Sequence, residues 1–336
     1  MTTKSEFLPL GEAAKRLGIS VGALKRRRQR CTINVVPKGD GGQFLYEVPA
    51  EHIGIVADEW EVLRELMPKA EVAHEEPVSQ GDTYSILSLF DVHVPDADAF
   101  AVRALLDFAR DRQPDHIVLG GDFLELESCS QHGGNPSPLA LVDEIKAGRK
   151  TLDRIREACP NAALTYLEGN HETRLHRVVA ANLPTFDGAI DIPNLLDLGG
   201  YGCEWVPYRK LWQPTLASGV KGKLFYTHGE WATMHHAAKH INAYGVSVRY
   251  GHTHKPQVFT RGYGDGRVCI AIGTGCLRTL SPSWAGPNNG WLHGFGWDEF
   301  WPDGRFTAKN IVMVDRSFCW DGKAYGPVNK SINPKP

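Results

Sequence analysis

The chain has 336 residues, of which 42% are apolar and 23% are charged, and its formal net charge is −2. This length is typical of about two domains, and the composition excludes a chain that is mainly disordered. No apolar run approaches the roughly 20 residues that cross a bilayer, and the start lacks the apolar core of a signal peptide. Seven cysteines without a C-x-x-C pair do not predict a disulfide framework. We therefore expect a protein of the reducing cytoplasm that has no membrane partner.

The charges are unevenly distributed near the N-terminus. Residues 1–38 hold nine Lys/Arg against two Glu, a net charge of +7, whereas residues 39–76 hold two Lys/Arg against ten Asp/Glu, a net charge of −8. The segment 67–82 contains two prolines, a glycine and several acidic residues, which is typical of a linker. We therefore predict a small domain over 1–66, a linker over 67–82 and a larger domain over 83–336.

Two short helices are predicted at the start of the small domain. The first covers residues 10–17 and ends at Gly18, because glycine accepts the left-handed backbone at a helix end. Ser20 can cap the second helix, over 21–30, by accepting a hydrogen bond from its free backbone N–H groups. This second helix is basic and is expected to expose Lys25, Arg26, Arg27, Arg28 and Arg30. Two helices joined by a tight turn, the second of them basic, form the helix-turn-helix pattern.

A strand is predicted next, where Phe44, Tyr46 and Val48 alternate with polar residues after a Gly-Gly pair. With this strand as a wing, the stretch resembles the small winged helix-turn-helix domains of the MerR and excisionase type. The resemblance implies binding to DNA, with affinity that comes mainly from phosphate contacts of the basic helix. The alternative is that these cations form only the solvated face of a helix.

The larger domain alternates strands with helices, which predicts an α/β sheet covered on both faces. We expect strands at 84–90, 116–119, 163–167, 224–227 and 246–250, and helices at 96–112, 141–159, 172–181 and 234–243. Shorter strands are expected at 257–260, 268–272 and 311–314. A Trp/Gly-rich C-terminal extension over 281–336 is expected to wrap the core; the alternative is that its exposed tryptophans stack on bases.

Side chains that bind metals follow each of the first five predicted strands. The stretches are Asp91-Val92-His93, Gly121-Asp122, Gly169-Asn170-His171-Glu172, His228-Gly229 and Gly251-His252-Thr253-His254. Ligands of open α/β sheets bind beyond the carboxyl ends of the strands, so these groups are expected to converge. Within the two pairs spaced i, i+2, an extended backbone would place both side chains on the same side.

Seven of these residues are candidate metal ligands: Asp91, His93, Asp122, Asn170, His228, His252 and His254. Oxygen and nitrogen donors without a thiolate suit Mn²⁺, Fe or Zn²⁺ better than Ca²⁺. Seven ligands are too many for one catalytic ion that keeps a position open, so we predict two divalent ions, with Mn²⁺ first and Fe or Zn as alternatives. Two such ions would lower the pKa of a shared water and align the resulting hydroxide for in-line attack on a phosphate ester.

The ordered motifs D-x-H, G-D-x-x-E, G-N-H-E, H and G-H-x-H resemble those of the calcineurin-like metallophosphoesterase superfamily. The Trp/Gly-rich tail is similar to that of phosphoesterases encoded by phages and prophages. The resemblance implies a β-sandwich of mixed sheets flanked by helices. It implies one ion on Asp91, His93 and His254, another on Asn170, His228 and His252, and Asp122 as the bridge. It also implies that His171 is the general acid or orients the phosphate, and that Arg174 contacts the substrate phosphate.

The motifs of this chain differ from those of two well-known branches of the superfamily. Protein Ser/Thr phosphatases carry D-x-H-G and G-D-x-x-D-R-G, whereas this chain has Val94 after His93 and Glu125-Leu126 in the second motif. Repair nucleases of the superfamily usually have histidine at the position of Glu125. Our first hypothesis is hydrolysis of phosphodiester bonds in DNA. The alternatives are a phosphatase or phosphodiesterase on small phosphate esters, and a DNA-binding regulator with a vestigial phosphoesterase core.

Overall fold

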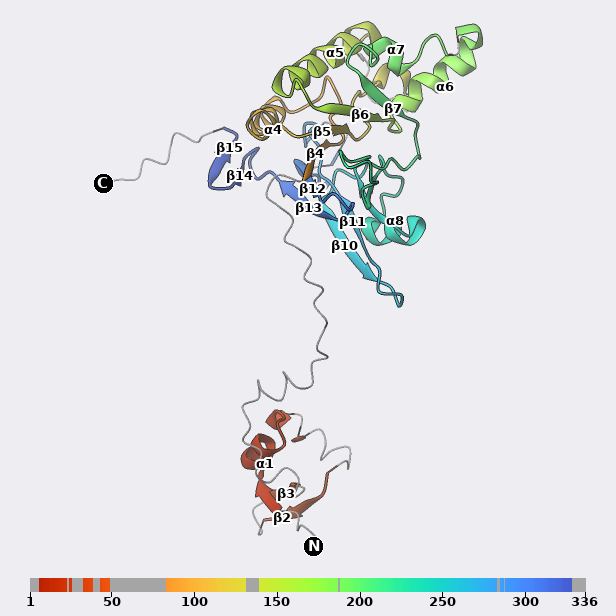
Figure 1. The fold of residues 1–336 in the computed structure, drawn as a ribbon. Coiled ribbons are helices and arrows are strands. Elements are labelled where there is room, and N and C mark those ends of the chain that lie inside the picture. The colour runs from red at the N-terminus through yellow and green to blue at the C-terminus, as the bar shows by residue number, and fades with distance from the viewer. Residues whose placement is uncertain are drawn as a thin grey trace, which may run out of the picture. The chain divides into compact units, whose positions relative to one another are not determined.

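The computed structural model describes residues 6–22, 24–25, 33–38, 43–48, 83–130, 139–186, 188–282, 285–286 and 288–327. These residues belong to two compact units, Met1–Pro77 and Val78–Pro336, which are considered separately (Figure 1). The predicted linker 67–82 lies outside the described residues. Within the described ranges, none of the helices combines the length and the apolar character needed to cross a membrane.

The small unit contains a three-stranded antiparallel sheet beside one helix. Its elements are β1 (Glu6–Pro9), α1 (Leu10–Arg16), β2 (Val35–Pro37) and β3 (Phe44–Val48), and the strand order is β1-β3-β2. The helix and β3 lie where the sequence predicts them. The other two strands were not predicted, because each is only three or four residues long and shows little apolar alternation.

A tight turn follows α1. Gly18 has a φ of +61°, and the Leu24 backbone N–H donates to the Ser20 carbonyl over 3.0 Å, as in a helical turn. The Leu24 side chain is fully buried in a cluster with Ala13. Lys25 is exposed. The other basic residues of the predicted recognition helix lie outside the described residues: Arg26, Arg27, Arg28 and Arg30. The winged helix-turn-helix therefore stays a prediction.

The larger unit contains two mixed sheets. The six-stranded sheet has the order β13-β12-β4-β5-β6-β7, and the four-stranded sheet has the order β10-β11-β9-β8. The first consists of β4 (Tyr84–Leu89), β5 (His116–Leu119), β6 (Ala163–Leu167), β7 (Cys203–Val206), β12 (Gly294–Phe300) and β13 (Phe306–Val312). The second consists of β8 (Leu224–Tyr226), β9 (Ser247–Tyr250), β10 (Gln257–Gly262) and β11 (Val268–Gly273). Strands β4 to β7 run parallel, and β12 is antiparallel to β4.

Helices cover the outer faces of both sheets (Figure 1). They are α4 (Ala99–Arg112), α5 (Leu141–Ala158), α6 (Glu172–Asn182), α7 (Ile192–Leu196) and α8 (His236–Tyr244). Leu87 and Ile117 pack in one core with α4 and α5, whereas Ile86 and Val118 pack with Tyr226 of the second sheet. Alternate residues of the central strands are thus buried on opposite faces. The result is a mixed α/β fold with two packed sheets between helices, in agreement with the predicted fold class.

A buried ion pair joins the two sheets. Arg249 of β9 donates from Nε to Asp298 Oδ2 of β12 over 2.8 Å, and the Tyr226 hydroxyl donates to the same oxygen over 2.8 Å. All three side chains are fully buried. The pair satisfies charges that would otherwise be costly in the core, and it links one sheet to the other.

The region 281–336 does more than wrap the core. Its strands β12 and β13 extend the six-stranded sheet, and β14 (Phe318–Trp320) and β15 (Lys323–Tyr325) form a hairpin. The prediction missed β12, whose sequence GFGWDEF lacks a clear period of two. Gly296 is required there, since a Cβ would lie 2.4 Å from Ser88 Oγ. Trp297 is buried against Phe108, and Trp284 lies outside the described residues.

Candidate metal centre

The loops after β4, β5, β6, β8 and β9 converge at one edge of the sheets. Three overlapping groups of ligand atoms lie within 4.8 Å of one another: Asp91 with His93 and His254, His93 with Asp122 and His171, and Asp122 with His228 and His252. Every member is buried except His252, which is half-buried. The expected convergence of distant strand ends therefore occurs.

The backbone turns sharply at these residues. Five of them have a positive φ: Asp91 (53°), His93 (53°), Asp122 (47°), His252 (67°) and His254 (57°). The expectation that the i, i+2 pairs lie on an extended backbone was wrong. Residues other than glycine seldom adopt this conformation, which costs about 1–3 kcal/mol each. Strained residues clustered at one point are typical of a functional site.

The first group contains Asp91, His93 and His254. The Nε2 atoms of the two histidines are 3.1 Å apart, and His254 Nε2 is 3.4 Å from Asp91 Oδ1. Asp91 Oδ1 is buried and has no hydrogen-bond partner among the described residues. Asp91 Oδ2, in contrast, accepts from the backbone N–H of His252 over 2.8 Å. A cation between these atoms would neutralise the carboxylate and satisfy the unpaired oxygen.

Glu125 supports this group from behind. Its Oε2 lies 2.7 Å from His93 Nδ1 and 3.2 Å from Arg278 Nη1. Burial raises the pKa of Glu125 to about 8, although Arg278 opposes the shift. A carboxylate beside Nδ1 holds the ring so that Nε2 faces Asp91 and His254, an arrangement common behind metal-binding histidines.

The second group contains Asp122, His228 and His252, with Asn170 among them. The His228 ring donates from Nδ1 to the Gly120 carbonyl over 3.0 Å, so its Nε2 faces Asp122 Oδ2 at 3.3 Å and Asn170 Oδ1 at 3.0 Å. Asn170 Oδ1 is also 2.8 Å from His252 Nδ1. Burial lowers the pKa of His228, but the Asp122 carboxylate outweighs it and raises that pKa to about 10. Asp122 Oδ2 and Asn170 Oδ1 thus both face imidazole nitrogens. Without a metal, these nitrogens would need a proton to bond to the oxygens, and a divalent cation suits the same positions.

Asp122 lies between the two groups. Its Oδ2 is 4.0 Å from His93 Nε2 on one side and 3.3 Å from His228 Nε2 on the other. Its Oδ1 accepts from the backbone N–H of His171 over 2.8 Å. Although burial raises the pKa of this carboxyl, the neighbouring His171 and His228 outweigh burial and hold it well below its usual range. This position is the one that a bridging carboxylate would need.

Glu172 holds the backbone that carries these ligands. Its carboxylate accepts from the backbone N–H groups of Asp122, Phe123, Leu124 and Gly169, and from the Tyr166 hydroxyl. The side chain is fully buried. Gly169 must be glycine, because a Cβ would lie 2.2 Å from Asp122 Oδ1. Glu172 therefore holds the backbone of these loops and does not orient an imidazole ring.

His171 lies at the edge of the cluster beside Arg174. The ring donates from Nδ1 to the Glu125 carbonyl over 2.7 Å, and Arg174 Nη2 lies 2.8 Å from Nε2. Because a guanidinium only donates, Nε2 is the acceptor and the ring is neutral with its proton on Nδ1. Burial lowers the pKa of His171 to about 4, although Asp122 opposes the shift.

Two residues that follow β11 in the chain, Arg278 and Trp291, also reach the centre. Arg278 is 1% exposed, and its Cζ lies 5.4 Å from the centre of the Trp291 ring. The Trp291 ring is in turn 4.4 Å from the His254 ring. Neither residue was predicted, since each stands outside any motif and only the tertiary structure brings it to the site.

No family model matches the chain. The Gene 54 protein of Mycobacterium phage L5 is 26% identical over 256 residues, which cover 71% of this chain and 98% of the relative. The Gene 54 protein of Mycobacterium phage D29 is 28% identical over the same shares. Both relatives are phage proteins, which fits the predicted phage origin.

Solved structures with detectable similarity include a phosphoesterase, Yfce from E. coli, and Vps29 from Chaetomium thermophilum. The first is 14% identical with a TM-score of 0.33, and covers 68% of this chain and 98% of that chain. The second is 10% identical with a TM-score of 0.36, and covers 68% and 97%.

Proposed function

We propose that the protein is a two-metal phosphoesterase that hydrolyses phosphodiester bonds in DNA. One observation carries the proposal: imidazole nitrogens and acidic or amide oxygens from five loops face one another around Asp122. Divalent cations would satisfy this buried arrangement, and oxygen with imidazole donors suits Mn²⁺, Fe or Zn²⁺.

Asp91, His93 and His254 would hold one ion, Asn170, His228 and His252 the other, and Asp122 would bridge them. When bound, the two ions would activate a water for in-line attack and neutralise the charge of the phosphoryl oxygens. The chain's own contribution is to hold the ligands in place. Glu125 fixes the His93 ring, and Glu172 fixes the loop of Asp122.

His171 and Arg174 would act on the substrate. Arg174 can reach a phosphate if its Nη2 leaves His171, and a guanidinium suits phosphate oxygens geometrically. The same movement frees His171 Nε2 to accept a proton and pass it to the leaving oxygen. The hydrogen bond from Nδ1 to the Glu125 carbonyl keeps the orientation of the His171 ring constant while the proton is transferred.

DNA as the substrate is supported by the basic segment of the small unit. Lys25 is exposed there, and the residues predicted to accompany it are Arg26, Arg27, Arg28 and Arg30. Cations on the same chain would raise the local concentration of DNA at the metal centre.

One panel of substrates tests the function. The full chain, stripped with EDTA and reloaded with Mn²⁺, Fe²⁺ or Zn²⁺, is given plasmid DNA, single-stranded DNA, bis-p-nitrophenyl phosphate and p-nitrophenyl phosphate. We expect metal-dependent cleavage of DNA and of the diester, with little cleavage of the monoester. Cleavage of the monoester alone would identify a phosphatase instead. Activity that survives Asp122→Asn together with His252→Ala would exclude the two-metal centre.

A further inference from the structure

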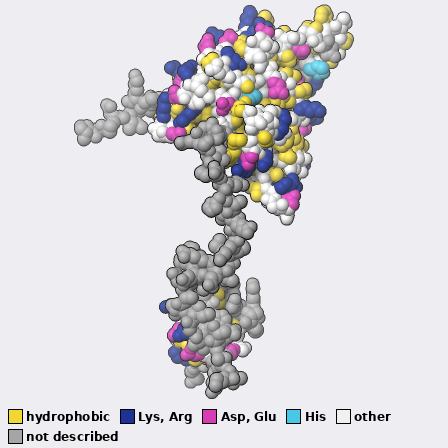
Figure 2. Space-filling view, in the orientation of Figure 1, with side chains coloured by type: hydrophobic (Ala, Val, Ile, Leu, Met, Phe, Trp, Pro, Cys, Tyr) yellow, Lys and Arg dark blue, Asp and Glu magenta, His cyan; other side chains and the backbone are white. Residues whose placement is uncertain are grey.

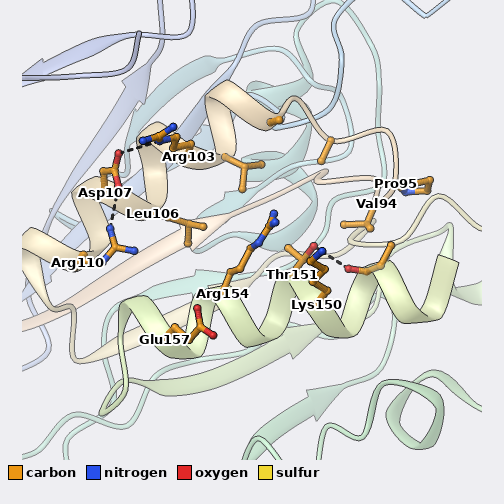
Figure 3. A pocket seen from close by; sticks show the side chains of 14 residues that line it. Val94, Pro95, Arg103, Leu106, Asp107, Arg110, Lys150, Thr151, Arg154 and Glu157 are labelled. Carbon is orange, nitrogen blue, oxygen red and sulfur yellow. Dashed lines mark hydrogen bonds and ion pairs between the residues drawn. The ribbon is translucent and has the colours of Figure 1, made fainter. Parts of the chain in front are cut away.

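A groove of about 710 Å³ runs between α4 and α5 on the outer face of the six-stranded sheet (Figure 3). Its apolar floor includes Leu106 of α4 and Ala147 of α5. Its rim carries four cations, Arg103, Arg110, Lys150 and Arg154, against two carboxylates, Asp107 and Glu157. The space-filling view shows Lys and Arg side chains at the place of these helices (Figure 2). The groove is therefore an open channel with an excess of positive charge.

The cations of the two helices differ in their partners. Arg103 and Arg110 of α4 both pair with Asp107, at 3.9 and 2.9 Å. Lys150 and Arg154 of α5 make no hydrogen bond or ion pair with any other described residue through their side chains. They stand four residues apart, so they lie on one face of α5 about 6 Å apart along its axis. Figure 3 shows Arg154 reaching from α5 into the space towards α4. These two charges are available to a ligand.

The groove also borders the loop that carries His93. Val94 and Pro95 line it, and they directly follow His93 in the loop after β4. This loop is held against the loop of Asp122, because the Val94 backbone N–H donates to the Phe123 carbonyl over 2.8 Å. A ligand in the groove would therefore approach the proposed cleavage site from the side of the first metal group.

We propose that the groove between α4 and α5 binds the phosphodiester backbone of the DNA strand that is cleaved at the metal centre. This inference rests on the proposed function, which places a phosphate ester at the metal centre next to the loop that borders the groove. A repeating polyanion fits two unpaired cations one helical turn apart, and the arginine fork suits phosphate oxygens. The backbone contacts would position the strand without reading its sequence.

The test compares two full-length double variants. The groove variant is Lys150→Ala with Arg154→Ala. The control is Lys146→Ala with Arg267→Ala, which removes the same charge from exposed sites outside the groove. Both are made in a full chain in which the five basic residues Lys25, Arg26, Arg27, Arg28 and Arg30 are alanine, so that the small unit does not mask the effect. Hydrolysis is measured with bis-p-nitrophenyl phosphate and with a DNA oligonucleotide, and affinity with a fluorescent oligonucleotide in EDTA.

We expect the groove variant to keep the control's rate on bis-p-nitrophenyl phosphate. Its kcat/KM on DNA should fall roughly tenfold, and the slope of log affinity against log salt should decrease by about 2, one for each lost phosphate contact. Equal DNA affinity and equal kcat/KM in the two variants would overturn the groove proposal and leave the metal centre untouched.

The failure of the proposed function gives a different result. If the parent chain hydrolyses neither substrate with any metal, the proposed chemistry fails, but the affinity measured in EDTA still decides whether the groove binds DNA. The affinity of both variants for poly-glutamate is measured as well, to distinguish DNA from an acidic protein as the ligand of the groove. If the groove variant loses affinity for poly-glutamate but keeps its affinity for DNA, the groove serves an acidic protein partner, and the proposal is overturned.

Discussion

Arg174 donates a hydrogen bond from Nη2 to Nε2 of His171 over 2.8 Å. The bond joins the residue expected to contact a phosphate with the residue expected to transfer a proton. It also keeps the imidazole Nε2 occupied, so His171 cannot accept a proton there until Arg174 turns away. A phosphate that attracts Arg174 would therefore prepare the acid of the same reaction.

Replacing His171 with alanine should affect substrates according to their leaving groups. We expect cleavage of DNA to fall about 10²–10⁴-fold, because an alkoxide must be protonated as it leaves. Hydrolysis of bis-p-nitrophenyl phosphate should fall far less, since nitrophenolate leaves without a proton. Initial rates on the two substrates check this, with His176→Ala on the exposed side of α6 as the control. Equal losses on both substrates would assign His171 a structural role.

Glu125→Gln should weaken metal binding without unfolding the protein. The substitution removes the carboxyl group that lies 2.7 Å from His93 Nδ1 and holds the ring. We expect metal affinity, measured by calorimetry with Mn²⁺ and Zn²⁺, to fall roughly 10–100-fold. Glu157→Gln, at an exposed position of α5, serves as the control. Unchanged affinity would mean that the His93 ring is held by packing alone.

Asp91→Asn and Asp122→Asn should differ in the number of ions lost. The unpaired oxygen of Asp91, Oδ1, faces His254 of the first group, whereas Asp122 Oδ2 lies near histidines of both groups. We therefore expect Asp91→Asn to lose one of two bound ions and Asp122→Asn to lose both. Elemental analysis of dialysed protein measures the stoichiometry. Retention of one tightly bound ion by Asp122→Asn would contradict its position as a bridge.

Gly169→Ala should damage both stability and the metal centre. A Cβ at this position would lie 2.2 Å from Asp122 Oδ1 and 2.3 Å from its backbone N, so the loop must move. We expect the free energy of unfolding to fall by roughly 2 kcal/mol and metal binding to weaken. Gly264→Ala is the matched control, because nothing lies within 4 Å of its Cβ position. Thermal denaturation with and without metal separates the two effects.

The stability of the larger unit should depend on pH through His116 of β5. This ring is buried between the Tyr84 hydroxyl and Thr165 Oγ1, and burial lowers its pKa to about 4. The unfolded chain takes up a proton near pH 6.5, which the folded protein resists until about pH 4. The free energy of unfolding should therefore decrease as the pH is lowered from about 6.5 to about 4. His116 alone should account for up to about 3 kcal/mol of this decrease.

His116→Gln should remove that part of the pH dependence. Urea denaturation in EDTA at pH 7, 6, 5 and 4.5 measures the free energy of unfolding of both proteins. We expect the difference between them to shrink as the pH falls, because only the histidine protein is penalised by protonation of its unfolded state. A constant difference would show that His116 is protonated without cost in the folded protein.

The sequence determined the central strands and the residues at their ends. Asp91, Asp122 and His252 could be placed because short apolar runs end abruptly in ligand-type residues, and parallel strands bring such ends to one edge. Strand β12 was not predicted because its two glycines interrupt the alternation of apolar and polar residues. Its pairing with β4 also joins residues about two hundred positions apart.

Only the tertiary structure decided how the site is supported. Glu125, in the loop after β5, lies beside His93, in the loop after β4, and its other partner, Arg278, lies 153 positions away. The bond between Arg174 and His171, the left-handed turns at the ligands and the groove between α4 and α5 likewise follow from packing. The local periodicity of apolar residues predicts which face of a strand or helix is buried. The type of a residue determines which metals or substrates it can bind. Which distant side chain fills the space behind that ligand depends on how the layers pack, and no single segment carries that information.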